Sequence, residues 1–198
     1  MGSSVALRIS ALFCLSLPLI VLSGCLYTVN PAYYPSDIVF LSELIGEWQD
    51  QANPDHEWIF RPAEDKEKAY DFIYKMDGEQ QFIISARLFK LEDDLFLDFF
   101  PEEEVKASKS GLVVPLHMIA KVNIVREDYF ELVYLNSDWA GENTKIFENQ
   151  ITHVEGSIDI LSSRGDENRM LLIKYAQKAF SLQEDGKNII KFGRISTE

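Results

Sequence analysis

Cysteine is nearly absent from this 198-residue chain, and the position of its two cysteines excludes several classes of protein. Cys14 and Cys25 both precede residue 26, so residues 26–198 offer no thiol for a disulfide bond or a thiolate metal site. The apolar stretch from Ile9 to Leu22 is also too short to cross a membrane, because a spanning helix needs about 20 residues. The rest of the chain must therefore fold around a hydrophobic core of its own.

Basic residues are scarce too. The chain has 19 Lys and Arg against 32 Asp and Glu, which gives a formal net charge of −13. Such a chain repels nucleic acid and the anionic headgroups of lipids. We therefore expect no nucleic-acid partner and no electrostatic adhesion to membranes.

The sequence lacks the common catalytic and cofactor motifs. It has no G-x-S-x-G, no H-E-x-x-H, no phosphate-binding glycine loop and no EF-hand spacing. Its three histidines, His56, His117 and His153, stand alone, without a second metal-type ligand nearby in sequence. The sequence thus predicts no cofactor and no metal, and leaves open whether the chain is an enzyme.

The N-terminal segment has the parts of an export signal: Arg8, the apolar stretch, and the small residues Ser23 and Gly24. The four residues Leu22-Ser23-Gly24-Cys25 resemble the lipobox of bacterial lipoproteins. The resemblance implies that residues 1–24 are a cleaved signal peptide and that Cys25 carries the lipid, palmitate included. Leu26 follows the cysteine, and in such lipoproteins a residue other than Asp there implies the outer membrane, facing the periplasm. Without Arg8 the mature chain keeps 18 basic and 32 acidic residues, a net charge of −14.

The mature chain reads as one domain behind a short tether. Residues 25–35 contain Pro31, Pro35 and three tyrosines without periodicity, which predicts a lipidated N-terminus and a tether. Residues 36–198 are long enough for a single domain. We expect this domain to begin with a turn or two of helix capped by Ser36.

Hydrophobic residues then alternate with polar ones, which predicts half-buried antiparallel strands. Asp77-Gly78 is a strong hairpin signal between two of them. Residues 137–155 read as irregular or short helix, and one long helix, capped by Ser163, is expected near residues 166–180. The sequence therefore predicts a mainly β fold, an antiparallel up-and-down barrel or strongly curled sheet with one helix packed on it. The expected strands begin with residues 47–49 and continue with residues 69–76, 82–88, 95–99, 116–124, 130–134, 158–161 and 188–195.

Gly46-Glu47-Trp48 resembles the G-x-W signature of lipocalins and other calycins. In that family the tryptophan closes one end of the barrel and packs against an arginine from the last strand. The resemblance implies that Arg194 takes this role in a barrel of lipocalin-like shape. The chain departs from the family pattern because its long helix precedes the last strand.

Two groups of residues are candidates for a functional site. The first is a polar cluster on three successive expected strands, Arg87, Asp98, His117 and Lys121. It could form a polar site, or an outer face partly covered by the helix and stabilised by charge pairs. The second is the expected lining of the barrel: Tyr70, Phe72, Phe82, Ile84, Leu97 and Met118.

Three functions remain open from the sequence. The chain could be a membrane-anchored binding or interaction module, for a small apolar ligand or for another envelope protein. It could be a structural accessory subunit whose barrel is filled. It could also be an enzyme that uses the cluster of Arg87, Asp98, His117 and Lys121, which would need a cleft in which His117 meets a carboxylate.

Overall fold

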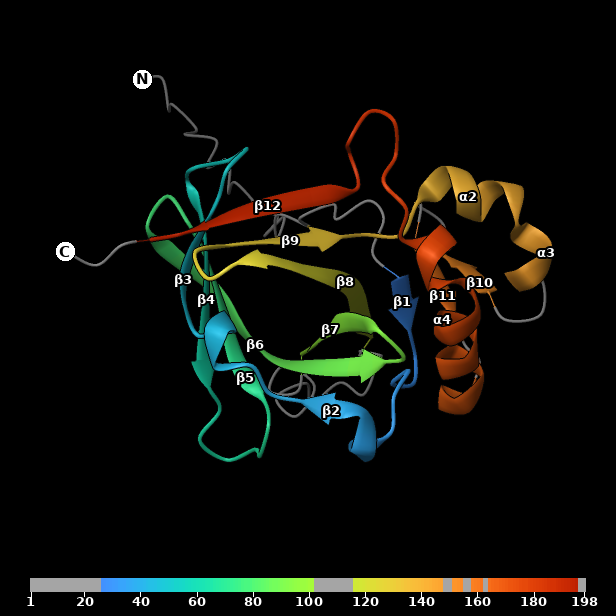
Figure 1. The fold of residues 1–198 in the computed structure, drawn as a ribbon, viewed down its shortest axis with the longest axis horizontal. Helices are drawn as coiled ribbons and strands as arrows, with labels where there is room; N and C mark the ends of the chain where they lie inside the picture. Colours follow the sequence, from blue (N-terminus) through green and yellow to red (C-terminus); the bar gives the residue numbers. More distant parts are fainter. Residues whose placement is uncertain (1–25, 102–115, 148–150, 155–157, 162–163, 196–198) are drawn as a thin grey trace, which may run out of the picture.

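The computed structural model describes residues 26–101, 116–147, 151–154, 158–161 and 164–195. The expected signal peptide, Cys25 and the expected cap Ser163 lie outside the described residues. All strands of the described part belong to one sheet, most of which closes on itself (Figure 1).

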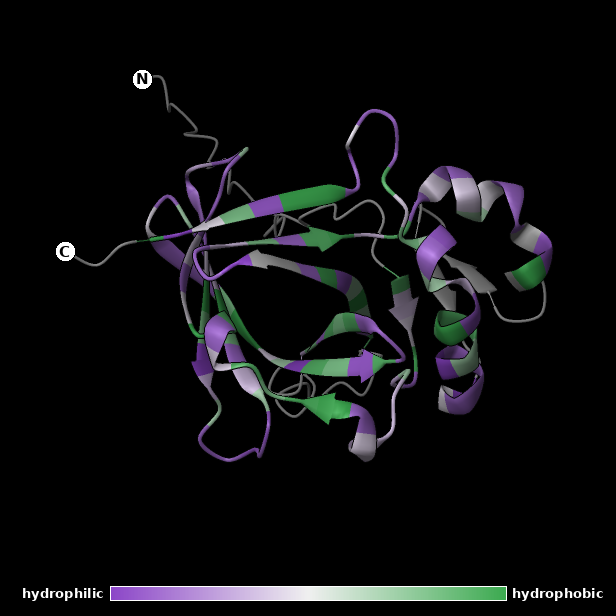
Figure 2. Cartoon of the chain, viewed as in Figure 1, coloured by the Kyte–Doolittle hydropathy of each residue, from purple (hydrophilic) through white to green (hydrophobic). Residues whose placement is uncertain are grey.

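Eight strands form a closed antiparallel barrel, which confirms the predicted fold class. Each pairs with the next along the chain, and the last, β12, pairs with β3 to close the ring. Hydrophobic and hydrophilic bands alternate along these strands (Figure 2), as expected when one face points inward. The eight are β3 (Gly46–Asp50), β4 (His56–Pro62), β5 (Tyr70–Met76), β6 (Glu79–Leu91), β7 (Asp94–Phe100), β8 (His117–Arg126), β9 (Tyr129–Val133) and β12 (Ile189–Arg194).

Additional strands extend the sheet outside the ring. β1 (Leu26–Thr28) pairs with the first half of β8 and with β11 (Ile158–Leu161), which pairs in turn with β10 (Ile151–Val154). β2 (Ile38–Val39) pairs with the second half of β6. The strand β4 has no counterpart among the expected strands.

The helices lie on one side of the barrel (Figure 1). The long helix α4 (Gly165–Ala179) confirms the prediction, although its N-cap is Arg164. The short helices α2 (Ser137–Glu142) and α3 (Thr144–Phe147) fall in the region expected to be irregular or helical. The expected opening helix is replaced by two 3-10 turns, η1 (Pro35–Asp37) and η2 (Ser42–Leu44), with β2 between them.

The tether prediction is wrong for the described residues. Leu26 and Thr28 are buried in β1, and Ala32 and Tyr33 are buried beyond it. The prolines and tyrosines of this stretch resemble a linker in composition, but non-local contacts make it part of the domain. We call residues 26–37 the N-terminal segment.

Two hydrophobic clusters form the core. One fills the barrel, and ten of its eighteen buried members are aromatic. The other lies outside the barrel wall, where α4 and the N-terminal segment cover β6, β7 and β8; it includes Phe89, Phe96, Leu172 and Phe180.

Candidate functional site

The polar cluster predicted from sequence is partly assembled on the outer face of the barrel. His117 Nδ1 lies 2.7 Å from Asp98 Oδ2, and Asp98 is 1% exposed and His117 7%. The imidazole also stacks on the Phe100 ring, with centroids 4.3 Å apart. Adjacent strands position these side chains, because Asp98 and Phe100 lie on β7 and His117 begins β8.

Tyr33 of the N-terminal segment completes this group. Its hydroxyl donates a hydrogen bond of 2.8 Å to Asp98 Oδ2, the oxygen that also contacts His117. Its ring stacks on Phe89, with centroids 4.6 Å apart. Burial raises the pKa of the Tyr33 hydroxyl well above its usual range, and the charge of Asp98 raises it further, while Arg87 acts in the opposite direction. Tyr33 therefore stays a neutral donor at physiological pH. We call Tyr33, Asp98 and His117 the polar seam.

The two cationic members of the predicted cluster have different positions. Arg87 is opposite Asp98 in the register of β6 and β7 and is half-buried. Lys121 instead forms an ion pair of 2.7 Å with Asp94. Gln177 of α4 donates to the same carboxylate at 2.9 Å. Lys121 thus belongs to the contact between α4 and the barrel and not to the polar seam.

The chemistry of an Asp-His pair is that of a general base held in one orientation. Such a base needs an open approach for the proton that it removes. Here the Tyr33 hydroxyl donates to the carboxylate, and both Asp98 and His117 are buried among the described residues. The described residues also contain no group of three His, Cys, Asp or Glu side chains suited to a metal ion. The arrangement fits a structural contact better than a catalytic one.

Trp48 and Arg194 meet at one end of the barrel. The guanidinium carbon lies 4.2 Å from the centroid of the Trp48 ring, which is 1% exposed. Arg194 also donates to the backbone carbonyls of Ile45 at 2.8 Å and Glu43 at 2.5 Å. Trp48 Nε1 donates to the Leu44 carbonyl at 2.9 Å. These hydrogen bonds hold η2 against the end of the barrel where Trp48 and Arg194 lie.

Gly46 is the residue that this arrangement requires. Its φ is +140°, a conformation that favours glycine, and a Cβ at this position would collide with the Arg194 guanidinium. The spacing of Gly46 and Trp48 thus has a physical cause in this chain: the glycine leaves room for the cation that covers the tryptophan.

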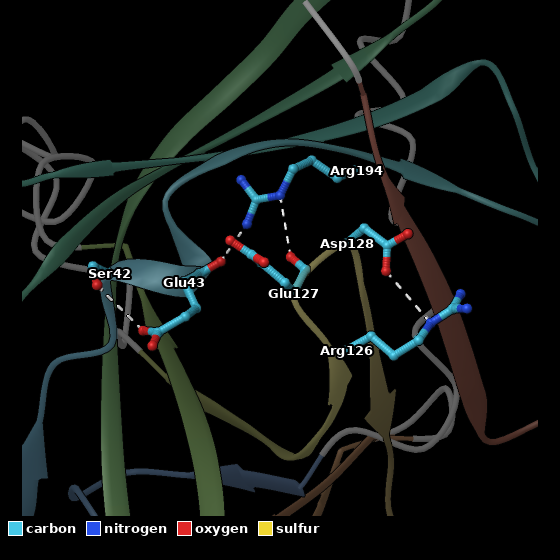
Figure 3. A pocket seen from close by; sticks show the side chains of 6 residues that line it. All are labelled: Ser42, Glu43, Arg126, Glu127, Asp128 and Arg194. Atoms are coloured by element: carbon cyan, nitrogen blue, oxygen red, sulfur yellow. Dashed lines mark hydrogen bonds and ion pairs between the residues drawn. The ribbon is translucent and has the colours of Figure 1, made fainter.

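A polar pocket of about 770 Å³ lies beside this end (Figure 3). Its cations are already engaged: Arg194 contacts backbone carbonyls, and Arg126 lies 3.4 Å from Asp128 on the exposed β8–β9 turn. The sequence does not predict this pocket, because its residues come from distant segments without a shared motif. The lining residues are Ser42, Glu43, Arg126, Glu127, Asp128 and Arg194.

The six residues expected to line the barrel all belong to its interior cluster or pack against it. The middle of the interior is occupied by aromatic rings. The ring centroid of Trp58 lies 4.7 Å from that of Phe192, 4.8 Å from Phe72 and 5.9 Å from Phe99. An eight-stranded barrel is wide enough for its own side chains or for one small ligand, and in this chain large rings occupy the middle of the interior.

Comparison with known proteins gives no relative: no family model, no curated protein and no solved structure matches the chain. Across the described ranges, no helix has the length and apolar character needed to cross a membrane.

Proposed function

We propose that the chain is a bacterial envelope lipoprotein, anchored through Cys25, that acts as a non-catalytic interaction module through the outside of a filled barrel. One observation carries the choice of an interaction module over a carrier. The barrel interior holds ten buried aromatic side chains, and the ring centroid of Trp58 lies 4.7 Å from that of Phe192 and 4.8 Å from that of Phe72. A ligand in the middle of the barrel would have to displace them.

The lipid anchor in this proposal rests on the sequence, through the resemblance of Leu22-Ser23-Gly24-Cys25 to a lipobox. Two or three acyl chains would bury enough hydrocarbon for stable attachment, at about 0.8 kcal/mol per CH2. We place the anchored protein at the outer membrane, facing the periplasm.

A second candidate function, binding of a small apolar ligand, is favoured by a difference between the ends of the barrel. Phe82 and Met118, two of the expected lining residues, are only partly buried, whereas Tyr70 and Leu97 have no exposed surface. A ligand would therefore bind near Phe82 and Met118 and not at the centre.

Fatty-acid labelling tests the anchor. Cells that express the wild-type chain or Cys14→Ser, the matched control in the expected signal peptide, should incorporate labelled palmitate into the protein. Cys25→Ser should not incorporate it. Label that persists in Cys25→Ser would overturn the anchor.

Native mass spectrometry and displacement of a fluorescent fatty acid separate the two candidate functions. The interaction module predicts that the purified protein carries no noncovalent lipid and displaces no probe. A copurified lipid, with displacement that Phe82→Ala weakens and the exposed control Ile83→Ala does not, would establish the carrier instead.

A further inference from the structure

The first strand begins at the residue that follows the proposed lipid attachment site. Leu26 pairs with Ile119 of β8, and Thr28 with His117. Consecutive Cα atoms are about 3.8 Å apart, so Cys25 can be no further than that from the start of a paired strand. No spacer separates the anchor from the folded domain.

The N-terminal segment is held from both sides. The barrel wall holds it through Tyr33 in the polar seam. The helix α4 holds it through Asn168, which donates to the Asn30 carbonyl at 3.1 Å, and through Arg169, which forms two hydrogen bonds to Asp37 of 2.8 and 3.1 Å. Releasing the segment would expose its buried apolar side chains and leave the buried Asp98 without Tyr33, which is costly.

The start of β1 lies beside the junction of β9 and α2. Leu26 of β1 is opposite Ile119 of β8, and Val133 of β9 is opposite Lys121 of β8. The start of β1 and the end of β9 therefore pair with positions on β8 that are two residues apart. Figure 1 shows the start of β1, the end of β9 and the helices α2 and α4 side by side. The backbone N–H of Asn136 ties the start of α2 to the Ala179 carbonyl at the end of α4, at 2.7 Å.

The surface at this junction has side chains that suit a membrane interface. Leu182, just after α4, is 60% exposed. Trp139 of α2 is half-buried against Tyr175, with ring centroids 5.8 Å apart, and the Lys174 ammonium lies over the Tyr175 ring at 5.0 Å. Tryptophan and tyrosine with an apolar body and a polar end are typical of the headgroup region of a bilayer.

We propose that the lipid on Cys25 holds the domain directly against a phospholipid bilayer, with α2 and the turn after α4 facing the headgroups. This proposal rests on the anchor put forward above. Covalent attachment sets the orientation, because the net charge of −14 provides no attraction to anionic lipids. The far end of the barrel, with the β8–β9 turn and the polar pocket, then points away from the membrane and is available to a partner.

Site-specific quenching tests the orientation. The mature chain has no thiol besides Cys25, so a single introduced cysteine can be labelled alone. Leu182→Cys reports on the proposed bilayer side, and Glu127→Cys, on the exposed β8–β9 turn, is the matched control at the other end. Both lipidated variants are bound to phosphatidylcholine vesicles that contain a headgroup-nitroxide lipid.

We expect quenching at position 182 to exceed that at position 127 severalfold. An insert of about 20 Gly and Ser residues between Cys25 and Leu26, with a reach of roughly 25 Å, should remove the difference. Equal quenching at both positions, or quenching at position 182 that the insert does not change, would overturn the orientation while the anchor stands. Failure of the wild-type protein to take up label and float with vesicles would overturn the anchor, and the orientation with it.

Discussion

The inside and the outside of the barrel wall are packed from different parts of the chain. Inside, the contacts are between rings, as between Trp58 of β4 and Phe72 of β5. Outside, Tyr33 meets Asp98, which is 65 residues away, and Asn168 meets Asn30, which is 138 residues away. The interior is held by contacts between rings, some of them far apart in sequence, such as Trp58 and Phe192. The outer layer instead ties the N-terminal segment to the barrel and to α4 through polar groups.

The largest expected effect is in the interior. Trp58→Ala should lower the free energy of unfolding by about 3–5 kcal/mol, because a large side chain that contacts several rings leaves a cavity. Urea unfolding at neutral pH measures this. Ile83→Ala, on the same sheet but 45% exposed, is the control and should change stability little. A small loss for Trp58→Ala would mean that the interior is loosely packed.

Tyr33→Phe should have the next largest effect and acts on the outer layer. It removes the hydroxyl that donates to Asp98 and keeps the ring on Phe89, so we expect a loss of about 1.5–3 kcal/mol. Urea unfolding of the two proteins measures it. If the variant is as stable as the wild type, the polar seam does not hold the N-terminal segment.

The same pair of proteins should differ in alkali. The folded-state pKa of Tyr33 is raised above the unfolded value of about 10. Its stabilising contribution is therefore complete below pH 10 and is lost as the pH rises further, because the unfolded chain releases the proton first. Unfolding curves from pH 8 to 11 should show that the advantage of the wild type over Tyr33→Phe shrinks with increasing pH. An advantage that grows would contradict the sign of the pKa shift.

Gly46→Ala should destabilise the closed end of the barrel by about 1–3 kcal/mol, since the new methyl group meets the Arg194 guanidinium. A double-mutant cycle sharpens this expectation: in an Arg194→Ala background the same change should be less harmful. Equal costs in the two backgrounds would assign the whole effect to the backbone conformation of residue 46.

The smallest effect is expected at the link between the N-terminal segment and α4. The hydrogen bonds from Arg169 hold the pKa of Asp37 below its usual range. Asp37→Asn should cost at most about 1 kcal/mol at pH 7, because the pair is partly exposed. The difference from wild type should persist above the unfolded pKa of about 3.9 and disappear as the pH falls through the folded one. Asp185→Asn, in an exposed pair with Lys187, is the control.

The elements of the fold differ in how well the sequence predicts them. Asp77-Gly78 specified its hairpin because both residues adopt positive φ, 54° and 76°. Strand β4 was not predicted, because Ile59 on the outer face is as buried as Trp58 and Phe60 on the inner face. Polar and apolar residues therefore do not alternate along this strand. Two-sided burial removes the signal on which strand prediction depends.

The candidate site was predictable only in part. Parity along the strands put Asp98 and His117 on one face, and the structure joins them at 2.7 Å. Strand parity could not show that Lys121, which is opposite Phe96, would form an ion pair with Asp94, two residues before Phe96 on β7. Tyr33 carried no signal, because it follows the three-residue strand β1 without belonging to a strand, and its partner Asp98 is 65 residues away.

Hydrogen exchange on the lipid-anchored protein tests most directly whether the N-terminal segment belongs to the fold at the membrane. The protein is bound to vesicles, and exchange of the amides of Leu26–Thr28 is compared with that of their partner strand β8. Our account predicts that β1 is protected about as strongly as β8 in the bound protein, because the anchor is joined to a strand that stays paired. Rapid exchange of β1 on vesicles, with β8 still protected, would show that the segment detaches and acts as the tether that its composition resembles.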